Sequence, residues 1–441
     1  MSDLLTLSSR IIDSGFADEP TNRVTNQLSE LASDLAIVES FSHVVVWNTG
    51  DGLVCFDTSS AGSAPAIIKA ISHWSTAPFH SLVYTHGHID HVGGSGTFAA
   101  HAKSQGHSEP FVIGHNNVSQ RFDRYRYTNN WNVAINRRQF GGIRAELGYG
   151  LVNRDGAPSQ IEHFLPEDCL RPNIEISDFC DMTFGDTTVE FHHARGETDD
   201  HLWAWIPNKK WVFTGDFMCW NFPNAGNPQK VQRYPIEWAA ALRAIVARQP
   251  ELLLPAHGLP IEGAQRIAKV LTEIADVLDK LVRDVIEMMN AGERLNTIIH
   301  TVRIPEEQLA KPYLRPMYDE PEFMIRNVWR QFGGWWDGYP SRLKPSPDDV
   351  LAREIVALSG GVHAVITRAH QLAENGDLRL ACHLADFAGD AAPDDPEVHE
   401  VRARIYELRR KSELSLMAKG IFKGASRESQ SVVDSNSDTD K

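Results

Sequence analysis

The sequence of 441 residues predicts an α/β domain followed by an all-helical region. Between residues 31 and 285, short apolar runs of strand length alternate with helical patterns and glycine-marked turns. Between residues 286 and 425, the pattern is that of successive helices. A polar N-terminal arm at residues 1–30, expected to be a surface segment or a short helix, and a polar, disordered tail at residues 426–441 complete the expected organisation.

The first elements of the α/β domain read as strands joined by a turn and followed by a helix. Apolar runs at residues 35–38 and 42–47 are typical of strands, and Gly50-Asp51-Gly52 forms a turn into a third run at residues 53–57. Residues 66–74 carry apolar side chains at helical spacing. This helix is expected to lead into the next strand.

A histidine-rich loop follows that strand, which we expect at residues 81–84. The loop places three imidazoles and one carboxylate in six residues, as His86, His88, Asp90 and His91. His86 and His88 are two residues apart and can face one cation, whereas Asp90 and His91 turn toward a second point nearby. The loop therefore predicts two adjacent metal ions.

The pattern His-x-His-x-Asp-His after a strand resembles the signature of the metallo-β-lactamase superfamily. That family has an αββα sandwich with one or two metal ions at the edge between its sheets. Later elements agree in order: a strand at residues 211–216 ends on Asp216, and one at residues 252–254 is followed by His257. The resemblance implies that Asp216 bridges both metals and that His257 is the last ligand.

One further ligand has two candidates. The resemblance expects a histidine after a glycine, but here Glu197 follows Gly196, and His201 comes four positions later. We prefer Glu197 because it lies 19 residues before Asp216, close to the spacing of the family. A glutamate here, with a strand ending Trp205-Ile206-Pro207, resembles the alkyl sulfatase branch. The expected first group is His86, His88 and Glu197, and the second is Asp90, His91 and His257, with Asp216 shared.

The C-terminal half resembles the same branch. After a long helix from about residue 261 to 290, Trp335-Trp336-Asp337-Gly338-Tyr339-Pro340 is similar to the end of the alkyl sulfatase dimerisation helix. Helices at residues 369–375, 380–389 and 396–411 then suggest tetratricopeptide-like packing. The resemblance implies a homodimer, in which a second copy covers the aromatic residues of this region.

Two departures from the branch concern the substrate. Many members carry a further C-terminal domain similar to a sterol carrier, which this sequence lacks, so we expect a shorter or more polar substrate than a detergent. The residues after Asp216 also differ, and they lead to Lys230 and Arg233.

Cationic residues are candidates for binding an anionic substrate group. Arg137 and Arg138 lie in a segment at residues 116–150 that is rich in arginine and aromatic residues, and Lys230 and Arg233 follow Asp216. The segment equally fits a solvated helix with salt bridges. An apolar part of the substrate is suggested by six aromatic residues: Trp203, Trp205, Trp220, Phe222, Trp335 and Trp336.

Together these features predict a binuclear zinc hydrolase that acts on a sulfate ester of a small or medium alcohol. A hydroxide between the two metal ions is the expected nucleophile, with Asp90, Asp216 and His201 as catalytic candidates. A lactonase, a thioesterase or another ester hydrolase on the same metal site is an alternative. A protein of another class, a non-catalytic metal-binding dimeric scaffold, is a second alternative.

Composition limits the partners and the compartment. A net charge of −15 argues against nucleic acid or an anionic membrane as the partner. The N-terminus lacks the pattern of a signal peptide, and no apolar stretch approaches the length of a membrane span, so cytoplasmic residence is expected. The five cysteines are scattered without a C-x-x-C spacing, which predicts neither disulfides nor a thiolate zinc site.

Overall fold

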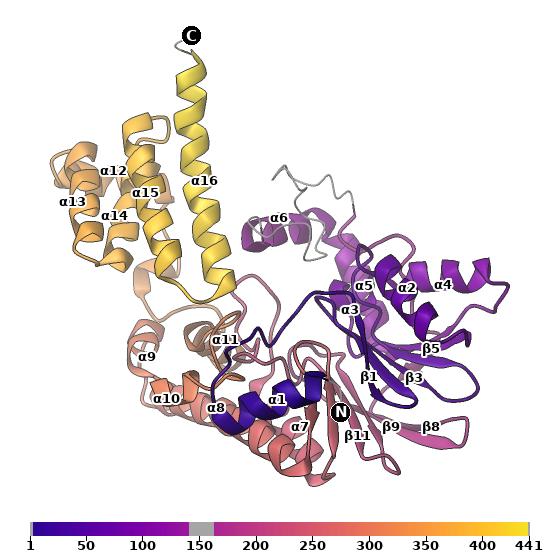
Figure 1. The fold of residues 1–441 in the computed structure, drawn as a ribbon. Helices are drawn as coiled ribbons and strands as arrows, with labels where there is room; N and C mark the ends of the chain where they lie inside the picture. The colour runs from indigo at the N-terminus through magenta and orange to yellow at the C-terminus, as the bar shows by residue number, and fades with distance from the viewer. Residues whose placement is uncertain (1–2, 141–162, 440–441) are drawn as a thin grey trace. The chain divides into compact units, whose positions relative to one another are not determined.

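The structure is a computed structural model that describes residues 3–140 and 163–439, and it contains two β-sheets (Figure 1). In both sheets, strands that follow one another in the chain are neighbours. The first sheet consists of β1 (Leu28–Ala32), β2 (Leu35–Val38), β3 (Val44–Asn48), β4 (Leu53–Phe56), β5 (Phe79–Val83), β6 (Phe111–His115) and β7 (Ile174–Ile176). The second consists of β8 (Phe179–Phe184), β9 (Thr187–His193), β10 (Leu202–Ile206), β11 (Trp211–Gly215), β12 (Leu252–Pro255) and β13 (Ile261–Glu262).

Alternating side chains bury both faces of the first sheet. Leu35 and Ile37 of β2 join the core cluster shared with the second sheet, whereas Ala36 and Val38 join the cluster under the outer helices. Between the sheets, the rings of Phe56 and Phe213 stack with centroids 3.6 Å apart. The strands are thus buried on both sides, as a central layer of a sandwich requires.

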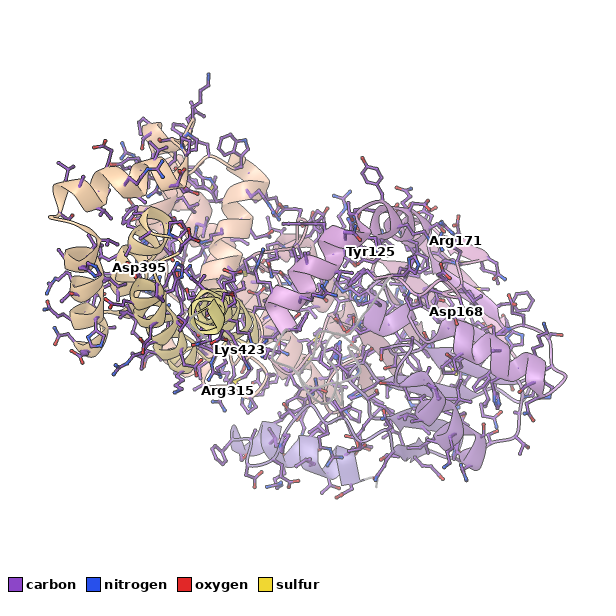
Figure 2. All side chains as sticks on the ribbon, turned by 90° about the horizontal axis from the view of Figure 1, so that it is seen from above. Tyr125, Asp168, Arg171, Arg315, Asp395 and Lys423 are labelled. Carbon is purple, nitrogen blue, oxygen red and sulfur yellow. The ribbon has the colours of Figure 1, made fainter. Side chains whose placement is uncertain are left out.

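Helices cover the outer faces of the two sheets. On the first sheet lie α2 (Ala64–Trp74), α4 (Ser95–Ser104) and α5 (Asn117–Tyr127), and on the second lie α7 (Pro235–Ala247) and α8 (Ala264–Asn290). The close approach of α4 to its neighbours requires glycine at position 96, since a side chain there would overlap Asp168 (Figure 2). The predicted αββα sandwich is confirmed, and shorter helices complete it: α3 (Ile89–Val92), α9 (Leu295–Thr301), α10 (Glu306–Leu309) and α11 (Pro321–Gly333).

The N-terminal arm contains a helix, α1 (Asp3–Ser14), that is part of the core. Leu4, Leu5, Ile11 and Ile12 are buried, and α1 packs against β13 and α8. These apolar residues recur on one face of the helix, and burial of that face outweighs the polar composition of the segment. The description of residues 1–30 as an arm therefore misses a core element.

The chain forms two compact units, and their boundary differs from the expected one near residue 285. The first unit comprises residues 1–133 and 144–334, and the second comprises residues 134–143 and 335–441. Helices α8, α9 and α11 thus belong to the catalytic unit, because their apolar faces join its core cluster. Helix α6 (Asn129–Phe140) contributes residues to both units.

The second unit is helical, as predicted. Asp395 caps the first turn of α15 by accepting bonds from the backbone N–H groups of Glu397 and Val398, at 3.0 and 3.3 Å (Figure 2). The helices of the second unit are η2 (Pro340–Arg342), α12 (Asp348–Leu358), α13 (Val362–Glu374), α14 (Leu378–Ala391), α15 (Pro396–Ser412) and α16 (Leu416–Thr439).

Within the described residues no single helix has the length and apolar character of a membrane span. Helices α12 and α13 pass this test only as a pair, which is bent by 90°.

The tail expected to be disordered is helical in the structure, since α16 continues to Thr439. The hydroxyl of Ser429 is buried, where it accepts a bond from Arg402 at 2.7 Å and pairs with Nδ1 of His399 at 3.1 Å. These polar contacts hold the later part of α16 against α15, in addition to apolar packing nearer its start, where Met417 is buried and Phe422 lies beside Tyr406.

The first prediction concerns α1. Replacing the fully buried Ile11 by alanine is expected to destabilise the protein by about 2–5 kcal/mol, since the substitution removes apolar contacts and leaves a cavity. The measurement is urea unfolding, with Phe16→Ala as control because Phe16 is 69% exposed. Equal effects of both substitutions would show that α1 does not belong to the core.

Candidate metal centre

Three strand ends and two loops bring the predicted ligands together. The loop after β5 carries the first histidines, and the backbone of His88 begins the short helix α3, which carries Asp90 and His91. From the second sheet, Asp216 follows β11 and His257 follows β12, which pair in parallel. Strands that run in parallel end at the same edge, so the two sheets deliver their side chains to one place.

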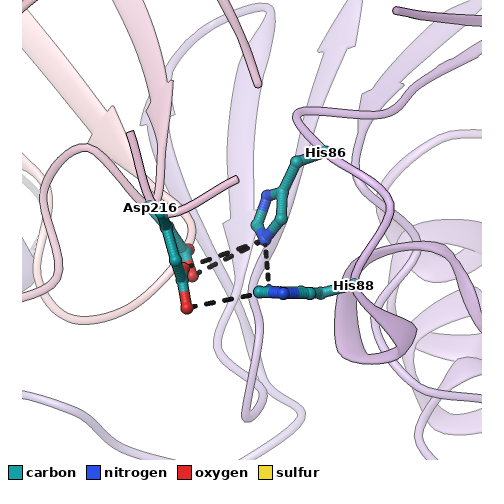
Figure 3. A group of neighbouring side chains, drawn as sticks. His86, His88 and Asp216 are labelled. Atoms are coloured by element: carbon teal, nitrogen blue, oxygen red, sulfur yellow. Dashed lines mark hydrogen bonds and ion pairs between the residues drawn. The ribbon is translucent and has the colours of Figure 1, made fainter. Parts of the chain in front are cut away.

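The first group of ligands comprises His86, His88, Glu197 and Asp216. Nε2 of His86 lies 2.8 Å from Nδ1 of His88 and 3.9 Å from a carboxylate oxygen of both Glu197 and Asp216. Nδ1 of His88 lies 3.7 Å from Oε1 of Glu197. Figure 3 shows the imidazole rings of His86 and His88 directed toward the carboxylate of Asp216.

The second group comprises Asp90, His91 and His257. Nε2 of His91 and Nε2 of His257 each lie 3.5 Å from Oδ2 of Asp90. Asp216 reaches this group as well, since its carboxylate lies 3.5 Å from His91 and 3.4 Å from His257. Asp216 thus stands between the two groups, the position predicted for a shared ligand.

These atoms fit divalent cations. Ligands of a tetrahedral zinc ion at about 2.0–2.1 Å stand about 3.3 Å apart. The separations of 3.4 and 3.5 Å in the second group are close to this value, and those in the first group lie on either side of it, from 2.8 to 3.9 Å. Among the described residues, Nε2 of His91 and Oδ1 of Asp216 are buried without a hydrogen-bond partner. Imidazole nitrogen and carboxylate oxygen are donors that zinc prefers, so a cation would satisfy both orphaned atoms.

The electrostatics of the pocket favour added positive charge. Burial, together with the neighbouring histidines, lowers the pKa of His86, so its imidazole stays neutral and able to ligate. Burial and the charge of Asp216 raise the pKa of Glu197 well above its usual range. Burial also lowers the pKa of His91, but Asp216, Asp90 and Asp57 raise it well above normal. The carboxylates therefore attract a cation, and a metal ion can take the place of the proton.

Asp57 supports the second group through Nδ1 of His91, the ring nitrogen that is not directed into the site. Its Oδ2 lies 2.8 Å from Nδ1 of His91, and the same carboxylate accepts bonds from the N–H and the hydroxyl of Thr85 at 2.8 and 2.9 Å. This pairing fixes the orientation of His91 so that Nε2 points into the site. The hydroxyl of Ser42 is also within 3.1 Å of Nδ1.

A buried ion pair supports the histidine loop. The guanidinium of Arg121 holds Asp200 with two bonds of 2.7 and 3.0 Å, and Asp200 accepts the N–H of Gly87 at 3.1 Å. Gly87 lies between two ligands, and a side chain there would overlap both Arg121 and Asp200. The pair therefore fixes the backbone from which His86 and His88 project.

Of the two candidates for the contested ligand, Glu197 lies in the first group and His201 does not. Nε2 of His201 accepts the backbone N–H of Asp216 at 3.2 Å, and its ring stacks on Phe217 with centroids 4.1 Å apart. Burial lowers the pKa of His201 to about 3, which suits a neutral acceptor. His201 thus positions Asp216, and a direct catalytic role stays a prediction.

The predicted substrate-binding residues lie in different places. Arg233 is buried and its guanidinium donates to the carbonyl oxygen of Glu197, so it contacts a ligand. Burial and Arg233 lower the pKa of Lys230 to about 7, and the charges of Asp90 and Glu197 also act on it. Arg137 and Arg138 are exposed on α6 in the second unit, and the rest of their segment, residues 141–150, lies outside the described residues. For all four, substrate binding stays a prediction.

Four of the six aromatic residues assigned to the substrate are core residues instead. Trp203, Trp205, Trp220 and Phe222 are buried in the cluster between the sheets and helices. The indole N–H of Trp220 donates to the carbonyl of Leu259 at 2.7 Å. These side chains stabilise the fold and are not available to a substrate.

Sequence reasoning missed several residues at the site. The amide of Asn224 donates to Oε1 of Glu197. Burial, followed by the charges of Glu197 and Asp90, raises the pKa of Tyr318. Cys219 differs from these, since its place three residues after Asp216 already suggests a position near the site, and its thiol donates to the carbonyl of Asp216 at 3.3 Å. Asp57, at the end of β4 beside β5, also had a usable signal, because a carboxylate at a neighbouring strand end is expected to reach the same edge.

Residues 38–257 match the family model of the metallo-beta-lactamase superfamily. With the αββα fold and the ligand groups, this match shows that the chain belongs to that superfamily. Residues 294–431 match the alkyl sulfatase dimerisation region, which assigns the chain to the alkyl sulfatase-like members and confirms the predicted family.

Similar proteins agree with this assignment. A linear primary-alkylsulfatase of a Pseudomonas strain is 25% identical over 81% of this chain, and an (R)-specific secondary-alkylsulfatase of Pseudomonas is 24% identical over 81%. The chain spans 68% of the first relative and 55% of the second. The solved structure of Pisa1, a stereoselective inverting sec-alkylsulfatase of Pseudomonas, has the same fold, with a TM-score of 0.78, 22% identity and coverage of 92% of this chain and 66% of that one.

The second prediction separates the two candidate ligands. Glu197→Gln is expected to weaken zinc binding to the first group by about tenfold or more, whereas His201→Ala weakens it less, since Nε2 of His201 bonds to the backbone N–H of Asp216 and His201 lies outside the ligand group. Titration of the metal-free protein with zinc against a chromophoric chelator measures both affinities. A larger loss in His201→Ala would assign the ligand to His201.

Proposed function

We propose that this protein is a binuclear metal-dependent hydrolase, with two zinc ions per chain, that cleaves a sulfate monoester of a small or medium alcohol. The observation that supports the reaction most directly is the resemblance of 81–85% of the chain to curated alkylsulfatases. The two adjacent ligand groups, with Glu197 in the first, support the use of metal ions. When bound, the two cations would activate a water molecule and offset negative charge on the attacked group.

The chain's own residues prepare the site for this chemistry. Asp216 connects the two ligand groups, because its Oδ2 lies 3.9 Å from Nε2 of His86 and 3.5 Å from Nε2 of His91. Five of the ligands, His86, His91, Glu197, Asp216 and His257, are buried, which strengthens their electrostatic contacts. Three of the seven ligands are carboxylates, so two bound divalent cations would keep one positive charge, which would attract an anionic ester.

Lys230 is the residue that we propose for binding the sulfate group. Its pKa of about 7 reflects burial and the nearby Arg233, while its interaction with Asp90 and Glu197 indicates a position beside the ligand groups. An ammonium ion in such a place pairs with an anionic group as a point charge. Arg233 is already engaged by Glu197 and would assist through its field.

The third prediction tests the reaction. The purified protein is expected to release inorganic sulfate from alkyl sulfates of several chain lengths. This activity should be lost on chelation and restored by zinc, because the reaction is proposed to need metal ions in the two ligand groups. Ion chromatography measures the sulfate. Opening of a lactone or hydrolysis of a thioester without any sulfate release would instead favour a carboxyl-type hydrolase, and binding of metal without turnover of any ester would favour a scaffold.

We also propose that the protein is a homodimer. Residues 294–431 match a dimerisation region, and aromatic residues are exposed where α11 ends: Phe332 is 51% exposed and Trp335 is 71% exposed. Exposed aromatic groups of this size cost free energy in water, and a symmetric interface would bury them.

The fourth prediction concerns this assembly. Light scattering at micromolar concentration is expected to give twice the chain mass of 49.3 kDa, and Trp335→Asp is expected to shift the protein toward the monomer because a charge would be buried in the interface. Leu408→Asp, at a side chain that is 37% exposed on α15, serves as control. A monomeric wild-type protein contradicts the proposal.

A further inference from the structure

The ten residues from Asn224 to Arg233 carry no helix or strand, yet both ends of this segment contact Glu197. Asn224 donates its side-chain amide to Oε1 of Glu197. Arg233 donates to the carbonyl oxygen of Glu197, and its Nη2 lies 3.6 Å from Oε1. The position of this ligand therefore depends on how the segment is held.

The segment is held at one end by Asp319, which precedes α11. The buried carboxylate of Asp319 accepts the backbone N–H groups of Gly226 and Asn227 at 2.5 and 3.1 Å. At Gly226 the chain approaches α11 so closely that a side chain would overlap Phe323. This approach fixes the backbone two residues after Asn224.

The other end is held by Asn327 of α11. Its side-chain oxygen accepts the N–H of Arg233 at 3.2 Å, and its amide donates to the carbonyl of Arg233 at 3.0 Å. Asn327 is buried, so both bonds form away from water. Arg330, one turn further, donates to Gln232 at 3.1 Å and to the carbonyl of Lys230 at 3.4 Å.

We propose that Asp319 and Asn327 are positioning residues for Glu197, which act through residues 224–233 and make α11 a determinant of metal affinity in the first group. Helix α11, which lies within the dimerisation region, thus has a second role, the support of a metal ligand. Side chains that orient a ligand typically affect metal affinity by about 10- to 100-fold. The inference rests on the proposed metal centre and is independent of which ester is cleaved.

The test compares two substitutions on the same helix. Asn327→Ala removes both bonds to Arg233, whereas Val328→Ala removes only apolar packing, since Val328 is buried in the core. Metal-free proteins are titrated with zinc against a chromophoric chelator, and unfolding is followed in urea. Asn327→Ala is expected to weaken one of two binding events by about tenfold or more. Val328→Ala is expected to lower stability and to leave both affinities unchanged.

A double substitution identifies the affected event. If Asn327 acts through Glu197, then Asn327→Ala added to Glu197→Gln changes the affinity little beyond Glu197→Gln alone. Equal weakening of both events by Asn327→Ala, or of neither, would overturn the inference and leave Asn327 with a structural role. If Asn327→Ala does not fold, the more exposed Arg330→Ala replaces it and must weaken the same event by a smaller factor. A wild-type protein that binds no zinc would refute the proposed function itself, which is a different result.

Discussion

The repulsion between the buried carboxylates of Glu197 and Asp216 is the constraint on which the rest of the site depends. Two anions in a water-poor pocket cost free energy unless a cation lies between them. The neighbouring residues bond to other atoms of these two ligands. Asn224 donates to Oε1 of Glu197 and Arg233 donates to its backbone carbonyl, while His201 accepts the backbone N–H of Asp216.

The metal ligands of the two sheets are held in place by different kinds of residue. The first sheet contributes mainly imidazoles, and their orientation is fixed by buried acids, Asp57 for His91 and Asp200 for the loop of Gly87. The second sheet contributes Glu197, Asp216 and His257. Asn224 and Arg233 donate hydrogen bonds to Glu197, whereas His201 accepts the backbone N–H of Asp216. His91 and Glu197 are thus each held by a group of opposite hydrogen-bonding character, which is how outer residues tune a metal site.

Local sequence predicted the parts of this site that local structure determines. His86, His88, Asp90 and His91 share one loop, and Asp216 and His257 each follow a strand, so their patterns were readable. Asn224 and Asn327 could not be found in this way, because only tertiary packing brings Asn224 to Glu197 and Asn327 to Arg233. Composition misled at the ends of the chain, where the apolar face of α1 and the buried hydroxyl of Ser429 in α16 are hidden among polar residues. It also misled for Trp203 and Trp220, since aromatic content does not reveal which face of an element is buried.

The ligands are spread over the chain from His86 to His257, and this spread has a consequence during synthesis. Because the carboxylates and the last histidine come from the second sheet, a nascent chain that has emerged only as far as β7 holds imidazoles and Asp90 but lacks Glu197, Asp216 and His257. Complete ion sites can form only after β12 has left the ribosome. Metal capture at both groups would therefore be a late event, and α8 and α11, which complete the core of this unit, emerge later still.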